Sequence, residues 1–297
     1  MRKDERDLTR VARQLINSTG VTSLAVRNVY GIRFTDPMPR SREIWKPSLG
    51  LILEGAKQIQ LEDTIRVLEK GFFVITPFAL PITSRIMKEN KNSSYLSILL
   101  NLEFKDFSDV DQMLGPMTSD DDSSVSLAIA TGRTTHDLSA AAFRLLSICQ
   151  CEADARALGP SIKREMIYYA LGTPAGKSVR NFIFSGQKIS NVITRISSDL
   201  SEEFDANSAA KKIGVSRAVF YRQFKRVTGM SPIQYQKRLR LLEARRLMLT
   251  LDETVERSSQ EVGFNSVSQF SREFSRLFGR PPKEEIKAAK KNPFLNE

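Results

Sequence analysis

Cysteine and histidine are almost absent from this chain of 297 residues, which has two cysteines and one histidine. Cys149 and Cys151 lie two residues apart in a stretch with helical periodicity, where their side chains face different directions and make a poor disulfide. A metal-dependent enzyme built on a β-barrel needs two or three histidines and a carboxylate around its metal. Since His136 is alone and lies outside the strand-like region, we expect reduced thiols, no metal, no cofactor and no enzymatic activity.

Long apolar runs are missing as well. No stretch approaches the roughly 18 consecutive apolar residues that a membrane-spanning helix requires. The N-terminal residues 1–7 are mostly charged and do not lead into the apolar segment of a secretory signal. We therefore expect a soluble protein of the cytoplasm that has no membrane partner.

Basic residues, by contrast, are plentiful in the last third of the chain. From Gln187 onward there are 21 Lys and Arg against 13 Asp and Glu, a net charge of +8, whereas the first 186 residues hold 24 against 21, a net of +3. A basic region beside a nearly neutral one favours a polyanionic partner for the basic part. A generally basic protein without such a partner is the alternative interpretation.

The first part of the chain has the pattern of a β domain. From about Val21 to Phe104, short strand-like segments alternate with turn residues, as in an all-β barrel or sandwich. The clearest predicted strands are 49–54, 56–61, 64–68, 72–76 and 95–100.

The remainder is predicted to be mostly helical. Residues 106–134 are mixed, with an exposed acidic loop at 120–122, and residues 137–184 have helical spacing. Residues 185–188 are polar and predict a linker, after which the chain is helical to about Lys290. The predicted division is a β-barrel in 1–110, a mixed and helical segment in 111–186, and an all-α domain in 187–290.

The last region contains an internal repeat, in which residues 210–232 are echoed by residues 259–282. With one residue inserted in the second copy, these pairs match: Gly214 and Gly263, Phe220 and Phe270, Arg222 and Arg272, Phe224 and Phe274, Arg226 and Arg276, Gly229 and Gly279, Pro232 and Pro282. So many coincidences at one offset indicate a duplicated unit.

Each copy has the pattern of a helix, a tight turn and a second helix, over about 206–229 and 255–279. Gly214 and Gly263 are placed to end the first helix, where a left-handed residue costs least. Ser216 in the first copy, and Asn265 or Ser266 in the second, are placed to cap the next helix. The sequence therefore predicts two helix-turn-helix units.

The second helix of each unit is predicted to be apolar on one face and polar or basic on the other. The inward residues are Phe220, Phe224 and Val227, then Phe270, Phe274 and Leu277. The outward residues are Ala218, Tyr221, Arg222 and Lys225, then Ser268, Ser271, Arg272 and Ser275. Such a helix suits insertion into the major groove of double-stranded DNA, where an arginine on guanine contributes about 1–3 kcal/mol of discrimination. An ordinary amphipathic surface helix is the alternative.

Residues 231–250 predict a single helix between the two units. They contain no glycine, and Pro232 stands at the first helical position. About 18 helical residues span roughly 27 Å, which is of the order of the ~34 Å between successive major grooves on one face of DNA. One chain would then read two adjacent grooves without dimerising.

The same helix is predicted to carry an apolar stripe and a basic face. The stripe consists of Leu241, Ala244, Met248 and Leu251. The basic residues off the stripe are Lys237, Arg238, Arg245 and Arg246, which either touch phosphates or form a solvated face.

Residues 189–286 resemble the DNA-binding domain of the AraC/XylS family of bacterial transcription regulators. The resemblance rests on the segment 227–247 (VTGMSPIQYQKRLRLLEARRL), on 262–264 (VGF) and on 268–274 (SQFSREF). It implies base contacts from the two second helices, RNA polymerase as a partner, and activation as the commoner mode of regulation. The predicted DNA-binding residues are Ser216, Arg217, Ala218, Tyr221, Arg222, Lys225, Val267, Ser268, Ser271 and Arg272.

Three positions depart from the family pattern. Ala209 stands where leucine is usual, and Ser258 and Ser259 stand where an Ile-Ala pair is usual. We expect the smaller and more polar side chains to loosen the packing beneath the second helices, above all in the second unit.

Residues 1–185 resemble, more loosely, the sensor half of one branch of this family, a cupin-like β-barrel followed by helices. The supporting segments are 46–57 (KPSLGLILEGAK), 143–146 (FRLL) and 163–171 (KREMIYYAL). The resemblance implies a small-molecule effector in the barrel and a homodimer formed through the adjoining helices. The expected fold is thus α+β and multidomain, with this barrel followed by an all-α domain of two helix-turn-helix units joined by a linker helix.

Three rival functions stay open at this point. The N-terminal domain would dock a protein partner instead of a small effector, the chain would be an enzyme with a DNA-binding tail, or it would bind DNA without regard to sequence as an architectural protein. The outward faces carry short side chains and single arginines rather than apolar wedges, which favours sequence reading over the architectural role.

Overall fold

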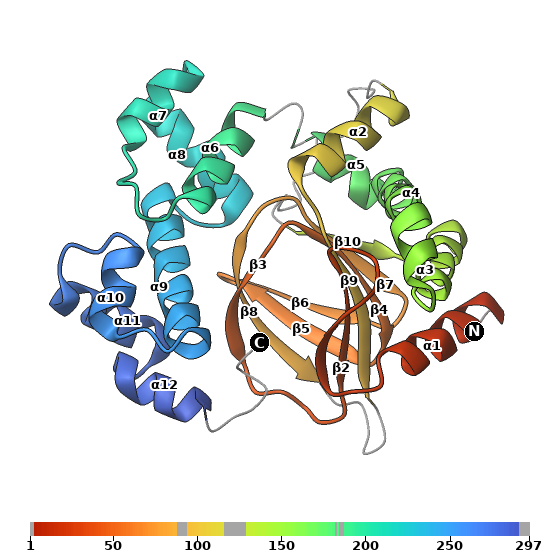
Figure 1. Cartoon of the computed structure of the whole chain (residues 1–297). Helices are drawn as coiled ribbons and strands as arrows, with labels where there is room; N and C mark the ends of the chain where they lie inside the picture. Colours follow the sequence, from red (N-terminus) through yellow and green to blue (C-terminus); the bar gives the residue numbers. More distant parts are fainter. Residues whose placement is uncertain (1–2, 88–93, 116–128, 182, 184–186, 291–297) are drawn as a thin grey trace.

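The computed structural model describes residues 3–87, 94–115, 129–181, 183 and 187–290. It has a β-barrel at the centre, with the helices within residues 3–180 on one side and those within residues 187–290 on the other (Figure 1). The acidic run expected to form a loop at 120–122 lies outside the described residues, as do residues 185 and 186 of the expected linker.

Two antiparallel sheets enclose the N-terminal core. The six-stranded sheet has the order β1 (Gly20–Ser23), β2 (Val29–Phe34), β9 (Tyr95–Asn101), β4 (Ser48–Glu54), β7 (Phe72–Thr76) and β10 (Ala130–Arg133). The four-stranded sheet has the order β3 (Ser41–Trp45), β8 (Leu80–Met87), β5 (Ala56–Leu61) and β6 (Thr64–Glu69). The five predicted strands are present, each within one residue of its predicted ends.

Strand β4 shows why the apolar runs of the first hundred residues form strands. Its residues from Ser48 to Leu53 are all buried, because the strand pairs with β7 and β9 and is covered on its outer face by helix α1. A strand covered on both faces has a continuous apolar sequence instead of an alternating one. Strand β10 pairs with β7, so the segment 111–186, predicted as separate from the barrel, also contributes to its sheet.

Helices cover the side of the barrel that faces away from the C-terminal domain (Figure 1). They are α1 (Lys3–Leu15), α2 (Phe104–Leu114), α3 (His136–Ile148), α4 (Glu152–Leu171) and α5 (Pro174–Arg180). Helix α1 packs on α3 and buries Leu8, Val11 and Ala12, which follow the spacing of one helix face. The charged N-terminal segment that carries α1 was not predicted to be helical.

The C-terminal domain is all α. Its helices are α6 (Gln187–Ser198), α7 (Ala206–Ile213), α8 (Arg217–Thr228), α9 (Pro232–Thr250), α10 (Val255–Glu261), α11 (Val267–Phe278) and α12 (Pro282–Lys290). Gln187 and Lys188, predicted to end a linker, instead begin α6. The prediction of two helix-turn-helix units on one joining helix is confirmed. Among the described residues, none of these helices is long and apolar enough to cross a membrane.

The hydrophobic core is divided unevenly between the domains. One continuous cluster runs from the barrel into the first unit, where it includes Phe220, Phe224 and Tyr235. The second unit has a separate cluster, which includes Phe270 and Phe274. The core of the first helix-turn-helix unit is therefore continuous with that of the barrel, whereas the second unit forms a separate core with α9.

Candidate DNA interface

The first unit is shaped by local signals that the sequence displays. Helix α7 ends at Gly214, whose φ of 75° is left-handed, and α8 begins after Ser216, whose hydroxyl accepts a hydrogen bond from the Val219 amide at 3.3 Å. Gly229, with φ 80°, ends α8. A left-handed glycine and a serine cap separate the two helices by a tight turn, which holds the start of α8 at the surface.

The inner face of α8 is aromatic. Phe220 and Phe224 are completely buried with ring centroids 5.7 Å apart, and Phe224 packs edge-on against Tyr235 of α9 at 5.5 Å. Val227 completes this face, as predicted. The packing fixes the rotation of α8 about its axis and so decides which residues face outward.

The outer face of α8 is polar and basic. The exposed residues are Ser216, Arg217, Ala218, Arg222 and Lys225, with Tyr221 half-buried. The Arg217 guanidinium lies over the Tyr221 ring, 5.3 Å from its centroid, and the same ring packs edge-on against Phe220. The predicted DNA-binding residues of the first unit therefore lie on one face of α8. Their contact with DNA stays a prediction.

The second unit repeats this arrangement with differences. Ser266, and not Asn265, caps α11 by accepting a hydrogen bond from the Gln269 amide at 3.3 Å. Ser268 and Arg272 are exposed, whereas Val267 and Ser271 are half-buried. The prediction for Leu277 was wrong in part, because the aromatic column continues from Phe274 to Phe278 at 4.3 Å and leaves Leu277 half-buried.

Two serines lie in the interior of the second unit. Ser258 and Ser259 of α10 are completely buried. The Ser259 hydroxyl donates to the Glu256 carbonyl at 2.8 Å, but the Ser258 hydroxyl has no hydrogen-bond partner within the described part of the chain. A buried polar group without a partner costs about 1–3 kcal/mol. Ser258 is therefore a specific reason to expect looser packing in the second unit, which stays a prediction. Ala209 is a small buried side chain in the first unit.

Helix α9 joins the units and begins with strong local signals. Ser231 and Gln234 form a reciprocal capping box, and Pro232 occupies the first helical position. Leu241, Ala244 and Met248 are buried as predicted. Leu251 is not part of the stripe, since the helix ends at Thr250 and the Leu251 side chain is 59% exposed.

The four basic residues of α9 for which the sequence allowed either phosphate contacts or a solvated face are paired within the chain. Lys237 pairs with Glu273 of α11 at 3.0 Å, and Arg238 pairs with Glu62 of the barrel. Arg245 is buried and pairs with Glu285 of α12 at 3.0 Å, and Arg246 pairs with Glu243 on its own helix at 2.7 Å. The first three pairs connect α9 to α11, to the barrel and to α12, whereas the pair of Arg246 lies within α9 itself.

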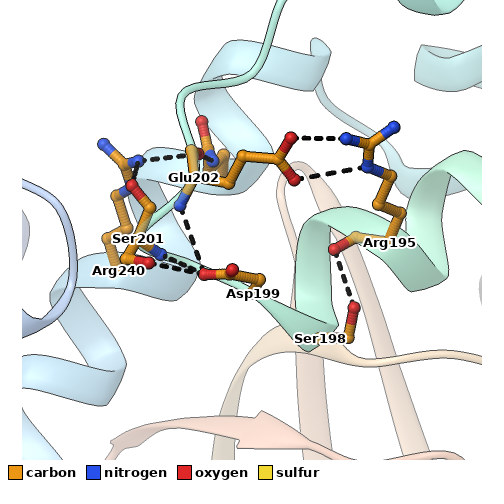
Figure 2. Close-up of polar contacts among 7 residues, drawn as sticks. Arg195, Ser198, Asp199, Ser201, Glu202 and Arg240 are labelled. Carbon is orange, nitrogen blue, oxygen red and sulfur yellow. Dashed lines mark hydrogen bonds and ion pairs between the residues drawn. The ribbon is translucent and has the colours of Figure 1, made fainter.

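Arg240, which the sequence did not single out, contacts the segment of Ser201 and Glu202 that precedes the first unit (Figure 2) and the turn of the second unit. Its guanidinium donates hydrogen bonds to the carbonyls of Leu200 at 2.6 Å, Glu202 at 3.0 Å and Gly263 at 2.9 Å. Burial lowers the pKa of Arg240, although an arginine stays protonated at any physiological pH. An arginine within an amphipathic helix carries no sequence signal for such a role, because its acceptors come from two distant loops.

The first unit is fastened to the barrel by α9. The Tyr235 hydroxyl donates to the Ala79 carbonyl at 2.5 Å, and burial raises its pKa, so that it remains a donor. The turn between α8 and α9 lies against the hairpin between β5 and β6, since a Cβ at Gly229 would be 3.5 Å from the Glu62 side chain. The ion pair of Arg238 with Glu62 closes the same contact.

A large cavity lies between the two domains, with a volume of about 1210 Å³. Its walls come from β1, β2, β3 and β8 of the barrel and from α6, α9 and α10 of the C-terminal domain. Apolar side chains such as Ile32, Phe34 and Leu242 line it together with the cationic Arg42 and Lys46. The cavity is large enough for a small molecule and presents it to both domains.

A polar cluster forms part of this wall. The Glu43 carboxylate accepts hydrogen bonds from the Ser84 hydroxyl at 2.6 Å and the Trp45 indole at 2.9 Å, and Lys57 lies 3.6 Å away. Burial raises the pKa of Glu43, but the charge of Lys57 and these hydrogen bonds outweigh it and lower the pKa overall. The carboxylate is therefore ionised and held in place.

Known protein families match both halves of the chain. The family described as the AraC-type transcriptional regulator N-terminus matches residues 25–178, and the helix-turn-helix domain family matches residues 209–288. The first match alone covers more than half of the chain, and together with the two-domain architecture it defines the class. The chain belongs to the AraC family of transcriptional regulators.

Two curated relatives match the DNA-binding end. The HTH-type transcriptional activator RhaS of Pectobacterium carotovorum is 33% identical over 97 residues, which is 33% of this chain and 35% of RhaS. The HTH-type transcriptional regulator GbdR of Pseudomonas aeruginosa is 30% identical over 98 residues, which is 33% of this chain and 27% of GbdR. The matched part thus spans about a third of the length of these relatives, which are named as regulators of transcription.

A solved structure resembles the whole chain. ToxT of Vibrio cholerae, crystallised with a bound unsaturated fatty acid, superposes with a TM-score of 0.56 over 87% of this chain and 93% of ToxT. The sequence identity is 13%, so the likeness establishes the shared fold alone. It agrees with the expected barrel-plus-helices architecture.

Proposed function

We propose that this protein is a sequence-specific transcription regulator that reads two successive major grooves of double-stranded DNA with α8 and α11. The observation that carries the proposal is the duplicated arrangement of a capped helix with a buried aromatic face and an exposed polar face. A single amphipathic helix has many uses, but two equivalent ones on a basic domain, joined by one helix, suit adjacent grooves.

The two faces would divide the work of recognition. Arg222 and Arg272 suit a guanine each, while the short Ala218 and Ser268 let the helix approach the base edges closely. Arg217, Tyr221, Val267 and Ser271 complete the base-reading faces. Ser216 and Lys225 stand at positions suited to phosphate contacts, which orient the protein without reading sequence.

We further propose that a small effector binds in the cavity between the domains and alters how the helices engage DNA. An occupant would touch the barrel and α9 together, which is a direct route from binding to DNA recognition. Since the ToxT structure holds an unsaturated fatty acid, an amphipathic carboxylate is a reasonable first class of molecule to test. The cavity offers apolar walls for its chain and Arg42 and Lys46 for its charge. Docking of a protein partner on the barrel is the alternative.

The remaining proposals rest on the family. We propose that the protein works in the cytoplasm, activates transcription through contact with RNA polymerase, and forms a homodimer through the helices that follow the barrel. The name of RhaS, a transcriptional activator, supports the sign of regulation.

Selection of bound duplexes from a random pool tests the main proposal. Sequencing should yield a motif with two half-sites about one helical turn apart. Equal affinity for every duplex at about 0.15 M salt would contradict sequence reading and favour the architectural role.

Arg222→Ala then tests the assignment of α8. The change should weaken binding to the selected site by about 1–3 kcal/mol and relax the preference at one base pair. Arg226→Ala is the matched control, because Arg226 is an exposed arginine of the same helix outside the predicted reading face. Unchanged affinity for the selected site in Arg222→Ala would show that α8 does not enter the groove as proposed.

A further inference from the structure

The two units have equivalent glycines whose surroundings differ. Gly214 and Gly263 both have a left-handed backbone, with φ of 75° and 82°. A Cβ at Gly214 would meet nothing within 4 Å, but a Cβ at Gly263 would lie 2.6 Å from the Ser201 carbonyl oxygen and 2.8 Å from an Arg240 nitrogen. The second unit therefore needs a glycine for close approach as well as for its backbone conformation.

Arg240 is the side chain that makes this approach possible. One of its terminal nitrogens donates to the Gly263 carbonyl, and its other nitrogens donate to carbonyls of the segment 200–202 that precedes the first unit. The guanidinium also lies 6.0 Å from the centre of the Phe264 ring. A planar group with five donors in a fixed fork can join two such backbone segments, and no other side chain has this geometry.

The segment that Arg240 holds is itself well ordered by hydrogen bonds (Figure 2). The Asp199 carboxylate accepts from the Ser201 hydroxyl at 2.6 Å and from the amides of Ser201 and Glu202 at 3.0 and 3.2 Å. The Glu202 carboxylate pairs with Arg195 of α6, and the Glu202 carbonyl also accepts from the Gln236 amide at 2.7 Å. Arg240 thus connects the turn of the second unit to the segment 200–202, which precedes the first unit and is held in place by these hydrogen bonds.

We propose that Arg240 is a positioning residue that fixes the second reading helix relative to the first and so sets the half-site spacing that the protein accepts. The proposal rests on the proposed function. Residue Gly263 opens the turn that leads into α11, so an anchor at its carbonyl constrains where α11 begins. Without the anchor, α11 keeps its own fold but its place along the DNA is less defined.

Binding to duplexes of different spacing tests this role. The selected operator is compared with one that carries about 5 extra base pairs between the half-sites, half a helical turn, which turns the second half-site to the opposite face. Wild-type protein should bind the altered duplex at least about tenfold more weakly, because it forfeits a base-reading contact. Arg240→Ala should bind the original duplex more weakly than the wild-type protein does. Its affinity for the duplex with the insertion should be less than about threefold below its affinity for the original duplex.

Matched variants separate positioning from simple destabilisation. Gly263→Ala should flatten the spacing dependence like Arg240→Ala, because its Cβ would displace both Ser201 and Arg240. Gly214→Ala imposes a similar left-handed backbone strain with open space around its Cβ, so it should keep the wild-type dependence. Arg246→Ala removes an arginine of α9 whose hydrogen bonds stay within that helix. This variant should also keep the wild-type dependence of affinity on half-site spacing.

The outcomes distinguish this inference from the proposed function. If Arg240→Ala and Gly263→Ala fold and still discriminate the two spacings at least tenfold, Arg240 does not position the second unit. If the wild-type protein binds all duplexes alike, the proposed function itself is wrong and the inference goes with it. If Arg240→Ala does not fold, Arg240→Lys gives the same test, since one ammonium group cannot hold both backbone segments.

Discussion

The two helix-turn-helix units descend from one sequence pattern but are embedded differently. The first shares its hydrophobic core with the barrel and is fastened to it by Tyr235 and by the ion pair of Arg238 with Glu62. The second has a separate core, and the buried hydroxyl of its Ser258 has no hydrogen-bond partner among the residues that the structure describes. Ile44 of β3 packs against both cores from the barrel side.

This difference indicates how changes in the barrel reach each unit. We expect a movement of the barrel to reach the first unit by direct packing, because close-packed cores pass on displacement. The second unit depends more on α9 and on discrete polar links such as Arg240. Because its core cluster is smaller and contains fewer buried apolar contacts, we expect the second unit to be the less stable of the two.

The largest expected effect comes from removing the central aromatic of each unit. Phe224→Ala and Phe274→Ala should each cost about 3–5 kcal/mol, the usual loss for a buried phenylalanine. Because the Phe224 core is continuous with the barrel, its loss should lower the free energy of unfolding of the whole chain, whereas Phe274→Ala should loosen the second unit alone. Hydrogen exchange resolved by segment measures this, and equal loss of protection in the barrel for both variants would contradict the division into two cores.

A smaller effect is expected at the contact between α9 and the barrel. Tyr235→Phe removes the donor to the Ala79 carbonyl and should cost about 1–2 kcal/mol, because the acceptor is left without its partner. Chemical denaturation monitored in the barrel should show this loss, and protection of α11 against hydrogen exchange should stay unchanged. Tyr221→Phe is the control, since Tyr221 is a half-buried residue of the outer face of α8 and not of the contact with the barrel.

The smallest effect should be a gain in stability. Ser258→Ala removes a buried hydroxyl that lacks a partner and should stabilise the second unit by about 1 kcal/mol or less, because the smaller side chain also gives up some packing. Ser259→Ala is the contrasting variant, since the Ser259 hydroxyl is hydrogen-bonded, and it should not stabilise. Slower hydrogen exchange in α10 and α11 of Ser258→Ala is the measurement, and faster exchange there would show that the hydroxyl is satisfied in solution.

Local features of the sequence were sufficient to predict most elements of the site. The cap at Ser216, the helix start at Pro232, the left-handed turn at Gly214 and the inward Phe220 and Phe224 depend on neighbours within one or two helical turns. Strand segments such as 56–61 and 72–76 were equally clear, because apolar runs between turn residues are local patterns. Helix α1 was not predicted, since its apolar residues are few among many charges and it becomes a stable helix by packing on α3.

Contacts between distant residues could not be predicted in this way. Lys237, Arg238 and Arg245 pair with carboxylates that lie 36 to 176 residues away in the chain, on α11, the barrel and α12. The interdomain cavity and its ionised Glu43 likewise exist only because strands and helices from both domains meet there. No periodicity or spacing in one sequence reports which surfaces will face each other.

The equivalent glycines of the two units separate what the local sequence determines from what the tertiary structure decides. At Gly214 and Gly263 the repeat alone was enough to predict a left-handed turn between two helices, because a positive φ is a property of one residue and its immediate neighbours. That Gly214 faces open space while Gly263 lies against Ser201 and Arg240 was decided by the packing of α9 against the segment 200–202, about forty residues earlier in the chain than Arg240. Two identical signals in the sequence therefore acquire different roles, because close packing depends on what the rest of the chain brings to each turn.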